Sequence, residues 1–358
     1  MKVASQPYLV LEIRREELLL DAFSQLWQRE QRELHRPLRV RLGSDGGEIG
    51  HDLGGVQIEF FNLFCNEICD PQRGLFETDS NTHLSWFKAA SLEPLHRYEL
   101  LGLLFGIALF NGITLPISFP RVFYAKLMGW EVDWEDFLTD WPHLHSTFTQ
   151  TAKYSGDIAD LIQHEDQVNV EALKWPGWSI RSTTQASSPV TNENRTEYLK
   201  LYSKWVFDYS IRPQFYAFAA GFYRVVDVRA IRLLTPLSFQ RLVEGSQDID
   251  VEDLKHHTKY EACTSSTPTI KWFWSIVESY DQQKLRRLLE FVTASKRMPA
   301  NGAAGLRFTI MAVEEQNGAL PGSSTCFGIL HLPKYETRDV MKQKLDIALE
   351  HSIGFGQA

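Results

Sequence analysis

The sequence predicts an α+β protein of two lobes, a mainly helical amino-terminal lobe and a small α/β carboxyl-terminal lobe joined by a short hinge. The chain has 358 residues, and at about 150 residues per domain this length favours two domains. Helical patterns dominate up to Gly245, whereas helices and short apolar strands alternate after it. The polar segment Gly245–Asp248 has the composition of a linker. We therefore expect lobes over residues 1–245 and 246–358, with a hinge near their junction.

The composition excludes several classes of protein. A hydrophobic content of 44% is that of a globular chain rather than a disordered one. With 37 basic and 45 acidic side chains the net charge is −8, which argues against nucleic acid as the main partner. Four cysteines are too few for a disulfide framework. No signal-peptide pattern opens the chain, and the longest apolar stretch, Leu100–Phe110, is too short to span a bilayer. We therefore expect a reducing cytoplasmic or nuclear compartment.

Apolar residues at helical spacing predict most elements of the first lobe. The range Arg14–His35 is expected to form the first helix, because apolar side chains recur there at i, i+3 and i+4. Leu38–Leu42 alternates like a short strand. The other expected helices cover Val56–Ile68, His96–Asn111, Pro120–Met128, Val190–Ser210, Pro213–Tyr223 and Ser238–Val243.

Smaller features of the first lobe also lead to expectations. Gly102 and Gly106 predict close packing of their helix inside a core, and Thr191 or Asn192 is expected to cap the helix that follows. The glycine-rich range 43–55 lacks the ending of a phosphate-binding loop, so we interpret it as a structural loop. Residues 133–189 mix aromatic and acidic side chains and are expected to form a small subdomain.

Cys65 and Cys69 raise the question of a metal site. They lie four residues apart on a predicted helix and therefore share a face. With His83 or His96 they could suggest zinc, but the spacing is not that of a zinc knuckle and no second pair exists. We expect them to pack in the core, and we expect no metal site.

The second lobe is expected to be a small α/β unit. Thr269–Tyr280, Gln282–Thr293 and Glu336–Ser352 have helical patterns, whereas Leu306–Val313 and Cys326–Leu332 have the apolar, β-branched composition of strands. Cys326 follows a polar loop and begins an apolar strand, so its thiol could be exposed while its neighbours are anchored. A thiolate is a strong nucleophile in such a position. The alternative is a small buried hydrophobic side chain.

Several stretches of the chain resemble, in order, the motifs of HECT-type ubiquitin ligases. The segment from Leu320 to Tyr335, which reads LPGSSTCFGILHLPKY, is similar to the active-site signature of that family. Phe355 stands fourth from the end, as in many members. The other matching stretches are Asp52–Phe61, Val190–Tyr198, Gln214–Phe222, Phe273–Trp274 and Phe291–Gly302.

This resemblance implies a two-step mechanism. Cys326 would take ubiquitin from the thioester of a ubiquitin-conjugating enzyme and pass it to a lysine of a protein substrate. The partners would thus be the conjugating enzyme, ubiquitin and the substrate, and no cofactor would be required. Thr325 would position the thioester carbonyl, although a local hydrogen bond is an equal alternative. Phe355 would pack across the carboxyl-terminal lobe or against the other lobe during transfer, the alternative being a terminal aromatic that only anchors the tail. Arg297 would orient the active-site loop or be a solvated surface residue.

Four positions depart from the family pattern. Ser324 stands where a His is usual, and a hydroxyl can only form hydrogen bonds where an imidazole could also favour the thiolate. Gly328 replaces a usual Asn, and Ile58 replaces a usual basic residue. Ala294 replaces a usual Gly, which is harmless only if its φ is negative.

The resemblance also implies a docking site for the conjugating enzyme in the subdomain over residues 133–189. An aromatic side chain in an apolar groove suits a transient interface, and residues four apart on a helix share a face. The alternative is that these side chains form the core of the subdomain. Local alignment assigns the groove to Leu144, Phe148, Tyr154, Ile162 and Tyr198, with Asp160 at its rim.

Two other functions compete with this interpretation. A non-catalytic scaffold of the same fold would bind the conjugating enzyme or ubiquitin without turnover, and its best support is Ser324 together with the unusual stretch Asp160–Trp178. A cysteine hydrolase would need a His and an Asn or Asp beside the thiol, but no hydrolase signature surrounds Cys326.

Overall fold

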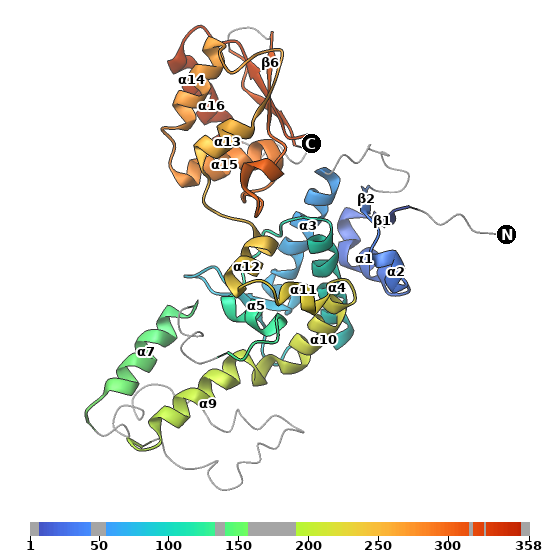
Figure 1. Cartoon of the computed structure of the whole chain (residues 1–358), viewed down its shortest axis with the longest axis vertical. Coiled ribbons are helices and arrows are strands. Elements are labelled where there is room, and N and C mark those ends of the chain that lie inside the picture. The colour runs from blue at the N-terminus through green and yellow to red at the C-terminus, as the bar shows by residue number, and fades with distance from the viewer. Residues whose placement is uncertain are drawn as a thin grey trace, which may run out of the picture.

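The computed structural model is an α+β fold with two lobes, which confirms the predicted class (Figure 1). It describes residues 7–43, 55–132, 140–156, 191–314, 318–325 and 327–351. The buried side chains separate into two main cores, one built between Leu9 and Val243 and the other between Ile249 and Leu349. Each lobe is therefore organised around its own apolar interior.

The amino-terminal lobe is mainly helical. Its β1 (Leu9–Ile13) lies parallel to β2 (Leu38–Leu42), and β3 (Phe76–Thr78) lies antiparallel to β4 (Ser85–Phe87). Its helices are α1 (Leu18–Leu26), α2 (Gln31–Leu34), α3 (Gly55–Ile68), α4 (Leu95–Phe110), α5 (Arg121–Leu127), α7 (Pro142–Lys153), α9 (Arg195–Phe207), α10 (Arg212–Tyr223), α11 (Val228–Ile231) and α12 (Pro236–Glu244).

Most of the expected helices of this lobe are present, but the first is not a single helix. The range predicted as one helix contains a 3-10 turn at Arg15–Glu17 and then α1 and α2, separated by residues 27–30. The pattern was misleading because Glu30 and Glu33 form a capping box that starts a new helix at Gln31. The predicted cap of α9 is also wrong, since the N-cap is Asn194.

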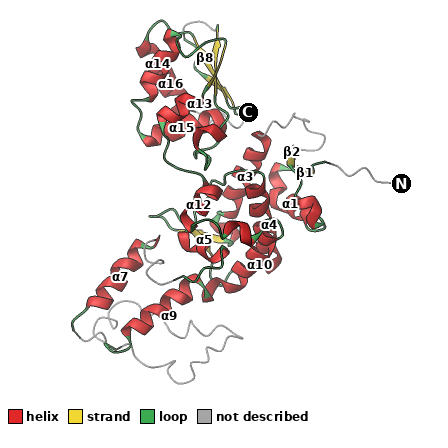
Figure 2. Ribbon diagram, viewed as in Figure 1, coloured by secondary structure: helices red, strands yellow, loops and turns green. Residues whose placement is uncertain are grey.

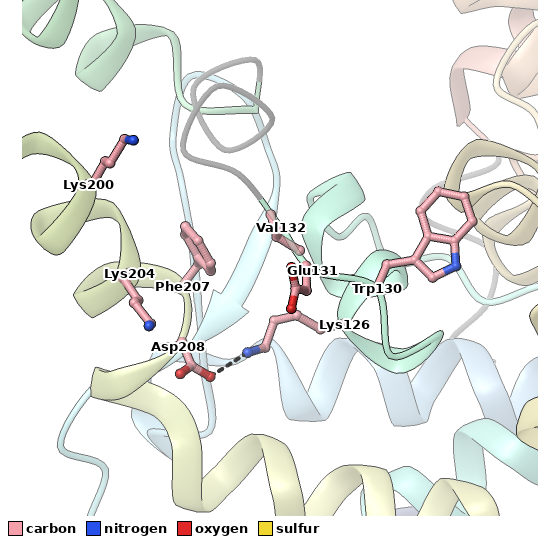
Figure 3. A pocket seen from close by; sticks show the side chains of 8 residues that line it. All are labelled: Lys126, Trp130, Glu131, Val132, Lys200, Lys204, Phe207 and Asp208. Atoms are coloured by element: carbon pink, nitrogen blue, oxygen red, sulfur yellow. Dashed lines mark hydrogen bonds and ion pairs between the residues drawn. The ribbon is translucent and has the colours of Figure 1, made fainter. Parts of the chain in front are cut away.

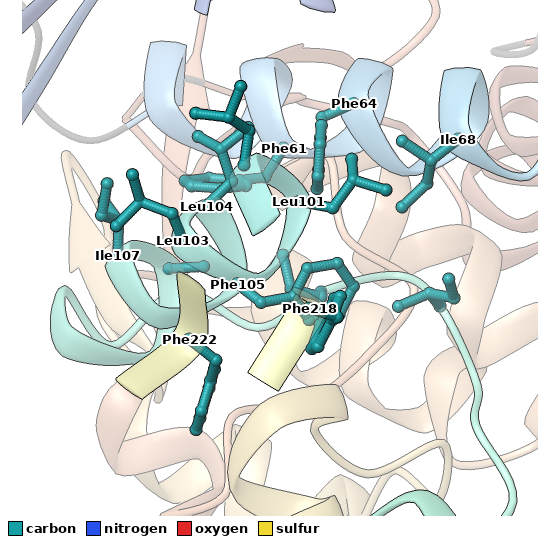
Figure 4. Close-up of a cluster of buried hydrophobic side chains, with 14 of the residues drawn as sticks. Phe61, Phe64, Ile68, Leu101, Leu103, Leu104, Phe105, Ile107, Phe218 and Phe222 are labelled. Carbon is teal, nitrogen blue, oxygen red and sulfur yellow. The ribbon is translucent and has the colours of Figure 1, made fainter. Parts of the chain in front are cut away.

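Glycine lets two central helices approach closely, as Gly102 and Gly106 predicted. A Cβ atom on Gly102 of α4 would lie 1.8 Å from the carbonyl oxygen of Phe218 in α10. A Cβ atom on Gly221 of α10 would lie 1.7 Å from the carbonyl oxygen of Glu99. Side chains of α3, α4 and α10 fill the surrounding core (Figure 4). Cys65 is 2% exposed in this core, and Cys69 packs against it.

The carboxyl-terminal lobe packs helices on a small mixed sheet (Figure 2). The sheet order is β5-β6-β8-β7, in which β5, β6 and β8 are parallel and the edge strand β7 is antiparallel to β8. The strands are β5 (Lys259–Glu261), β6 (Thr309–Val313), β7 (Gly322–Ser324) and β8 (Ile329–Pro333), and the helices are α13 (Val251–His257), α14 (Pro268–Val277), α15 (Gln282–Thr293) and α16 (Arg338–His351).

The expected strand over Cys326–Leu332 starts later than predicted. It begins at Ile329, and a separate short strand ends at Ser324. The reason is Gly328, which has a φ of +65° and so turns the chain before the strand begins. Residue 326 itself lies outside the described residues, as do 44–54, 157–190 and 352–358. No helix in the described ranges is long and apolar enough to cross a membrane.

The chain passes from the first core to the second after α12. Gly245 ends α12 with a φ of +73°, and a Cβ atom there would lie 2.4 Å from the carbonyl oxygen of Met298. Ser246 and Met298 exchange two backbone hydrogen bonds, each of 2.8 Å. The segment therefore leaves the first lobe through a glycine and is held by the loop that follows α15.

Ala294, which replaces a usual glycine, does not have the negative φ that would make this replacement harmless. It ends α15 with a φ of +58°, in the left-handed region that disfavours a Cβ atom. Its carbonyl oxygen accepts a hydrogen bond of 2.6 Å from Asn62 Nδ2 of α3, so the strained residue also joins the two lobes.

We predict that Ala294→Gly stabilises the protein by about 1 kcal/mol, because glycine relieves the strain of the left-handed helix end. Urea unfolding measures the change. The exposed Ala220 lies inside α10, so Ala220→Gly is the matched control and should destabilise by about 1 kcal/mol. A loss of stability in Ala294→Gly equal to that of the control would contradict this account.

Candidate active site

The chain on either side of residue 326 is fixed by two successive turns at the edge of the sheet. The carbonyl oxygen of Ser324 accepts a hydrogen bond of 3.0 Å from the Phe327 amide, and that of Thr325 accepts one of 3.2 Å from the Gly328 amide. A Cβ atom on Gly328 would lie 2.1 Å from the carbonyl oxygen of Arg307. Gly328 is thus required both by its φ and by the space around it, which explains why this departure from the family pattern is compatible with the loop.

A cavity of about 230 Å³ lies between this loop and the amino-terminal lobe. Thr325, Phe327 and Gly328 line it from the loop, and Gln57, Ile58 and residues 111–114 line it from the other lobe. Thr325 is half-buried, whereas Phe327 is 45% exposed. The predicted site residue Thr325 therefore faces the inter-lobe space, and so does Ile58, the residue that replaces a usual basic one.

Arg297 joins the two lobes beside this cavity. Its Nη1 atom lies 3.0 Å from Glu244 Oε2 and 3.3 Å from the Glu244 carbonyl oxygen, and its Nη2 atom donates to Ser118 Oγ. The side chain of Arg297 is 11% exposed and that of Glu244 is 4% exposed. The alternative of a solvated surface arginine is therefore wrong, and the partners of the guanidinium lie in the opposite lobe.

Glu244 was missed by the sequence analysis, although its carboxylate is the centre of this network. Its Oε1 atom accepts hydrogen bonds from the Phe119 amide (2.8 Å), the Tyr124 hydroxyl (2.7 Å) and Gln240 Nε2 (3.2 Å). Burial, together with the adjacent Glu244 carboxylate, raises the pKa of the Tyr124 hydroxyl, so Tyr124 stays protonated and donates. An acidic residue at the end of an amphipathic helix would by sequence alone be taken as exposed.

We predict that Arg297→Met lowers the free energy of unfolding by about 3 kcal/mol, because it leaves a buried carboxylate without its cation. The double variant Glu244→Gln/Arg297→Met should lose less than the sum of the two single variants, since glutamine needs no counter-charge. Urea unfolding of the four proteins of this cycle measures the coupling.

The control for that cycle is Arg241→Met, which removes an exposed arginine from the same α12 helix. It should change stability by less than about 0.5 kcal/mol. Strictly additive effects of the Glu244 and Arg297 substitutions would contradict the pairing.

Among the residues predicted for docking the conjugating enzyme, three have described side chains. Phe148 of α7 is 4% exposed and packs with Val122, Leu199 and Phe207 in a third, smaller core. Tyr198 of α9 is half-buried against that core, and burial raises the pKa of its hydroxyl. The Tyr154 carbonyl oxygen accepts a hydrogen bond of 2.7 Å from Arg195.

Phe148 thus occupies the core position that the sequence analysis left open as the alternative to a docking role. The remaining predicted docking residues are not described. The side chain of Leu144 lies outside the described side chains, and Asp160 and Ile162, like Phe355 and Cys326 of the active-site prediction, lie outside the described residues. The docking role of this set stays a prediction.

A second cavity, of about 470 Å³, lies between α5 and α9 (Figure 3). Lys126 Nζ forms an ion pair of 2.7 Å with Asp208 Oδ1, and both side chains are mostly buried. Burial lowers the pKa of Lys126 despite this partner. Lys200 and Lys204, four residues apart on α9, also line the cavity. This spacing was the signal from which sequence reasoning could have found a basic helix face.

In the part of the chain that the structure describes, no group of three or more His, Cys, Asp or Glu side chains is arranged to hold a metal ion. Cys65 is buried, and burial raises the pKa of its thiol well above the ordinary value. It is therefore an unreactive core residue. Cys263 is partly buried, and its Sγ lies 3.3 Å from the Glu261 carbonyl oxygen.

Comparison with known proteins extends over nearly the whole chain. The family model described as "HECT-domain (ubiquitin-transferase)" matches residues 62–358. The probable E3 ubiquitin-protein ligase HECTD2 of Mus musculus is 33% identical over 371 residues, which cover 98% of this chain and 46% of that protein. The probable E3 ubiquitin-protein ligase HUL4 of Eremothecium gossypii is 31% identical, covering 98% of this chain and 43% of that protein. The chain thus spans just under half the length of these curated relatives.

Proposed function

The chain belongs to the HECT-domain family of ubiquitin transferases, and on that premise we propose that it carries ubiquitin as a thioester on Cys326. The Cys326 thiolate attacks the thioester carbonyl of a loaded ubiquitin-conjugating enzyme, a new carbon–sulfur bond forms, and the thiolate of the conjugating enzyme leaves. The amine of a substrate lysine then attacks the new thioester. An isopeptide bond forms, the amine loses a proton, and the Cys326 thiolate is released. Neither step needs an oxidant, a reductant or a metal ion.

One observation carries this proposal beyond family membership. The Ser324–Phe327 and Thr325–Gly328 hydrogen bonds close two overlapping turns, and Thr325 and Phe327 of these turns border the cavity between the lobes. A carrier residue must meet two partners in succession, a donor thioester and an acceptor amine. A turn at the edge of a sheet, next to an inter-lobe space, suits that requirement better than a position inside a strand. Thr325, which lines the space, is proposed to position the thioester carbonyl, and Phe355 to pack across the lobe during transfer.

The conjugating enzyme is proposed to dock on the small subdomain that contains α7 and α9. Phe148 and Tyr198 support this role indirectly, because their packing holds the two helices together. The docking set is otherwise the predicted one, with Leu144, Tyr154 and Ile162 in the groove and Asp160 at its rim. A carrier thiol must also stay reduced, which agrees with the expected cytoplasmic or nuclear compartment.

We predict that mixing the protein with a conjugating enzyme loaded with labelled ubiquitin gives a new adduct on a non-reducing gel. The adduct should disappear on reduction and should be absent in Cys326→Ala. Cys263→Ala is the matched control, because it removes a different, partly buried thiol of the same lobe. Loss of the adduct in Cys263→Ala but not in Cys326→Ala would show that Cys263 carries ubiquitin, and would contradict the proposal.

The same assay separates the rival functions. A scaffold would bind the loaded conjugating enzyme but give no adduct across a broad panel of such enzymes. A hydrolase would release free ubiquitin from a ubiquitin chain, which a transferase of this kind does not need to do. Either result would replace the proposed function.

We predict that insertion of a proline after Gln247 slows ubiquitin transfer while binding of the conjugating enzyme is unchanged. The insertion stiffens the segment where the lobes must reorient between the two partners. Single-turnover transfer and a binding isotherm measure the two effects. Leu144→Asp is the complementary control, because it should weaken binding of the conjugating enzyme. A proline variant with the transfer rate of the unmodified protein would remove the hinge from the mechanism.

A further inference from the structure

A histidine from the neighbouring strand contacts the residue that replaces the family's usual histidine. The Nε2 atom of His331 on β8 lies 2.8 Å from Ser324 Oγ on β7. This is a normal hydrogen-bond distance, and which atom donates depends on the tautomer of the ring. The imidazole of His331 thus contacts the residue that stands two positions before Cys326 in the sequence, although His331 itself stands five positions after it.

The strand register makes this contact a consequence of the sheet. Gly322 is the residue directly opposite His331 in the antiparallel β7–β8 pair, and Ser324 is its diagonal neighbour on the same face. Leu330 and Leu332 alternate with His331, and both are buried in the core of the lobe. His331 must therefore lie on the outer face of the sheet, where it is half-buried and within reach of Ser324. Gly322 has no side chain to occupy the space between them.

The strand that precedes Cys326 has few other restraints. The edge strand β7 spans only Gly322–Ser324 and pairs with a single neighbour. Its last residue, Ser324, supplies the carbonyl oxygen that closes the first turn around position 326 by accepting from Phe327. A short edge strand is easily frayed. A side-chain hydrogen bond at its last residue is thus placed where it can hold the start of the active-site turn.

We propose that His331 is a positioning residue for the thiol chemistry at Cys326 and that it acts through the Ser324 hydroxyl. The inference rests on the proposed function of Cys326 as the carrier of ubiquitin. His331 holds Ser324 through its hydroxyl, and the Ser324 carbonyl oxygen closes the turn to Phe327; Cys326 stands between these two residues in the sequence. Ser324, which departs from the family pattern, then connects the loop to His331 on the neighbouring strand and does not impair the chemistry.

Four variants of the full chain test this inference. His331→Gln keeps an amide group at about the position of Nε2, whereas His331→Asn is the matched control whose shorter side chain does not reach Ser324. Ser324→Ala removes the partner, and Ser324→Ala/His331→Asn completes a double-mutant cycle. Two properties are measured on each. One is the single-turnover rate of adduct formation with a loaded conjugating enzyme, and the other is hydrogen exchange in a peptide covering residues 318–330.

We expect His331→Asn and Ser324→Ala to slow transfer about fivefold, the order of one hydrogen bond. Both should also speed exchange in the 318–330 peptide, while a peptide from α16 stays unchanged. His331→Gln should retain most of the rate and protection. The double variant should be no slower than either single variant, because both substitutions break the same contact.

Three results would overturn the inference. In the first, His331→Asn has the transfer rate and exchange protection of the unmodified protein. In the second, His331→Gln and His331→Asn lose rate and protection equally. In the third, the losses of the two single variants add in the double variant. If the unmodified protein forms no adduct, the proposed function fails by itself. The exchange measurement then still decides whether His331 holds the loop.

Discussion

The buried carboxylate of Glu244 is the constraint on which the arrangement of the two lobes depends. Its Oε1 atom accepts hydrogen bonds from three donors of its own lobe, and its Oε2 atom accepts one from the Arg297 guanidinium of the other lobe. A charge that is 4% exposed is costly unless it is paired and hydrogen-bonded. The carboxylate therefore favours the arrangement in which the loop after α15 lies against α12.

From that contact the position of the active-site loop follows step by step. Met298, next to Arg297, exchanges backbone hydrogen bonds with Ser246 at the lobe junction. Asn62 reaches across to the strained helix end at Ala294. These contacts set the second lobe so that Thr325 and Phe327 face the amino-terminal lobe across a cavity. A junction made of a few polar contacts is compatible with a lobe that must also leave this position during the reaction cycle.

The sequence was sufficient for the helices with strong apolar periodicity and for the close approach marked by Gly102. It was not sufficient where a local signal competes with the pattern. The capping box at Glu30 breaks an otherwise continuous helix, and the left-handed Gly328 delays the start of β8. The site was predicted from motifs whose residues are close together in the sequence. Glu244 and His331 act through contacts between elements, which no spacing of residues in one segment could reveal.

The central claim is that Cys326 forms a covalent bond to ubiquitin, and replacing its sulfur by oxygen tests this claim most directly. In Cys326→Ser a loaded conjugating enzyme should transfer ubiquitin to the serine hydroxyl as an oxyester, which a thiol reductant does not cleave. Intact mass and peptide mapping of the reduced product would then show one ubiquitin attached at position 326. Ubiquitin found only on lysines, or an unmodified protein despite measurable binding of the conjugating enzyme, would contradict the account.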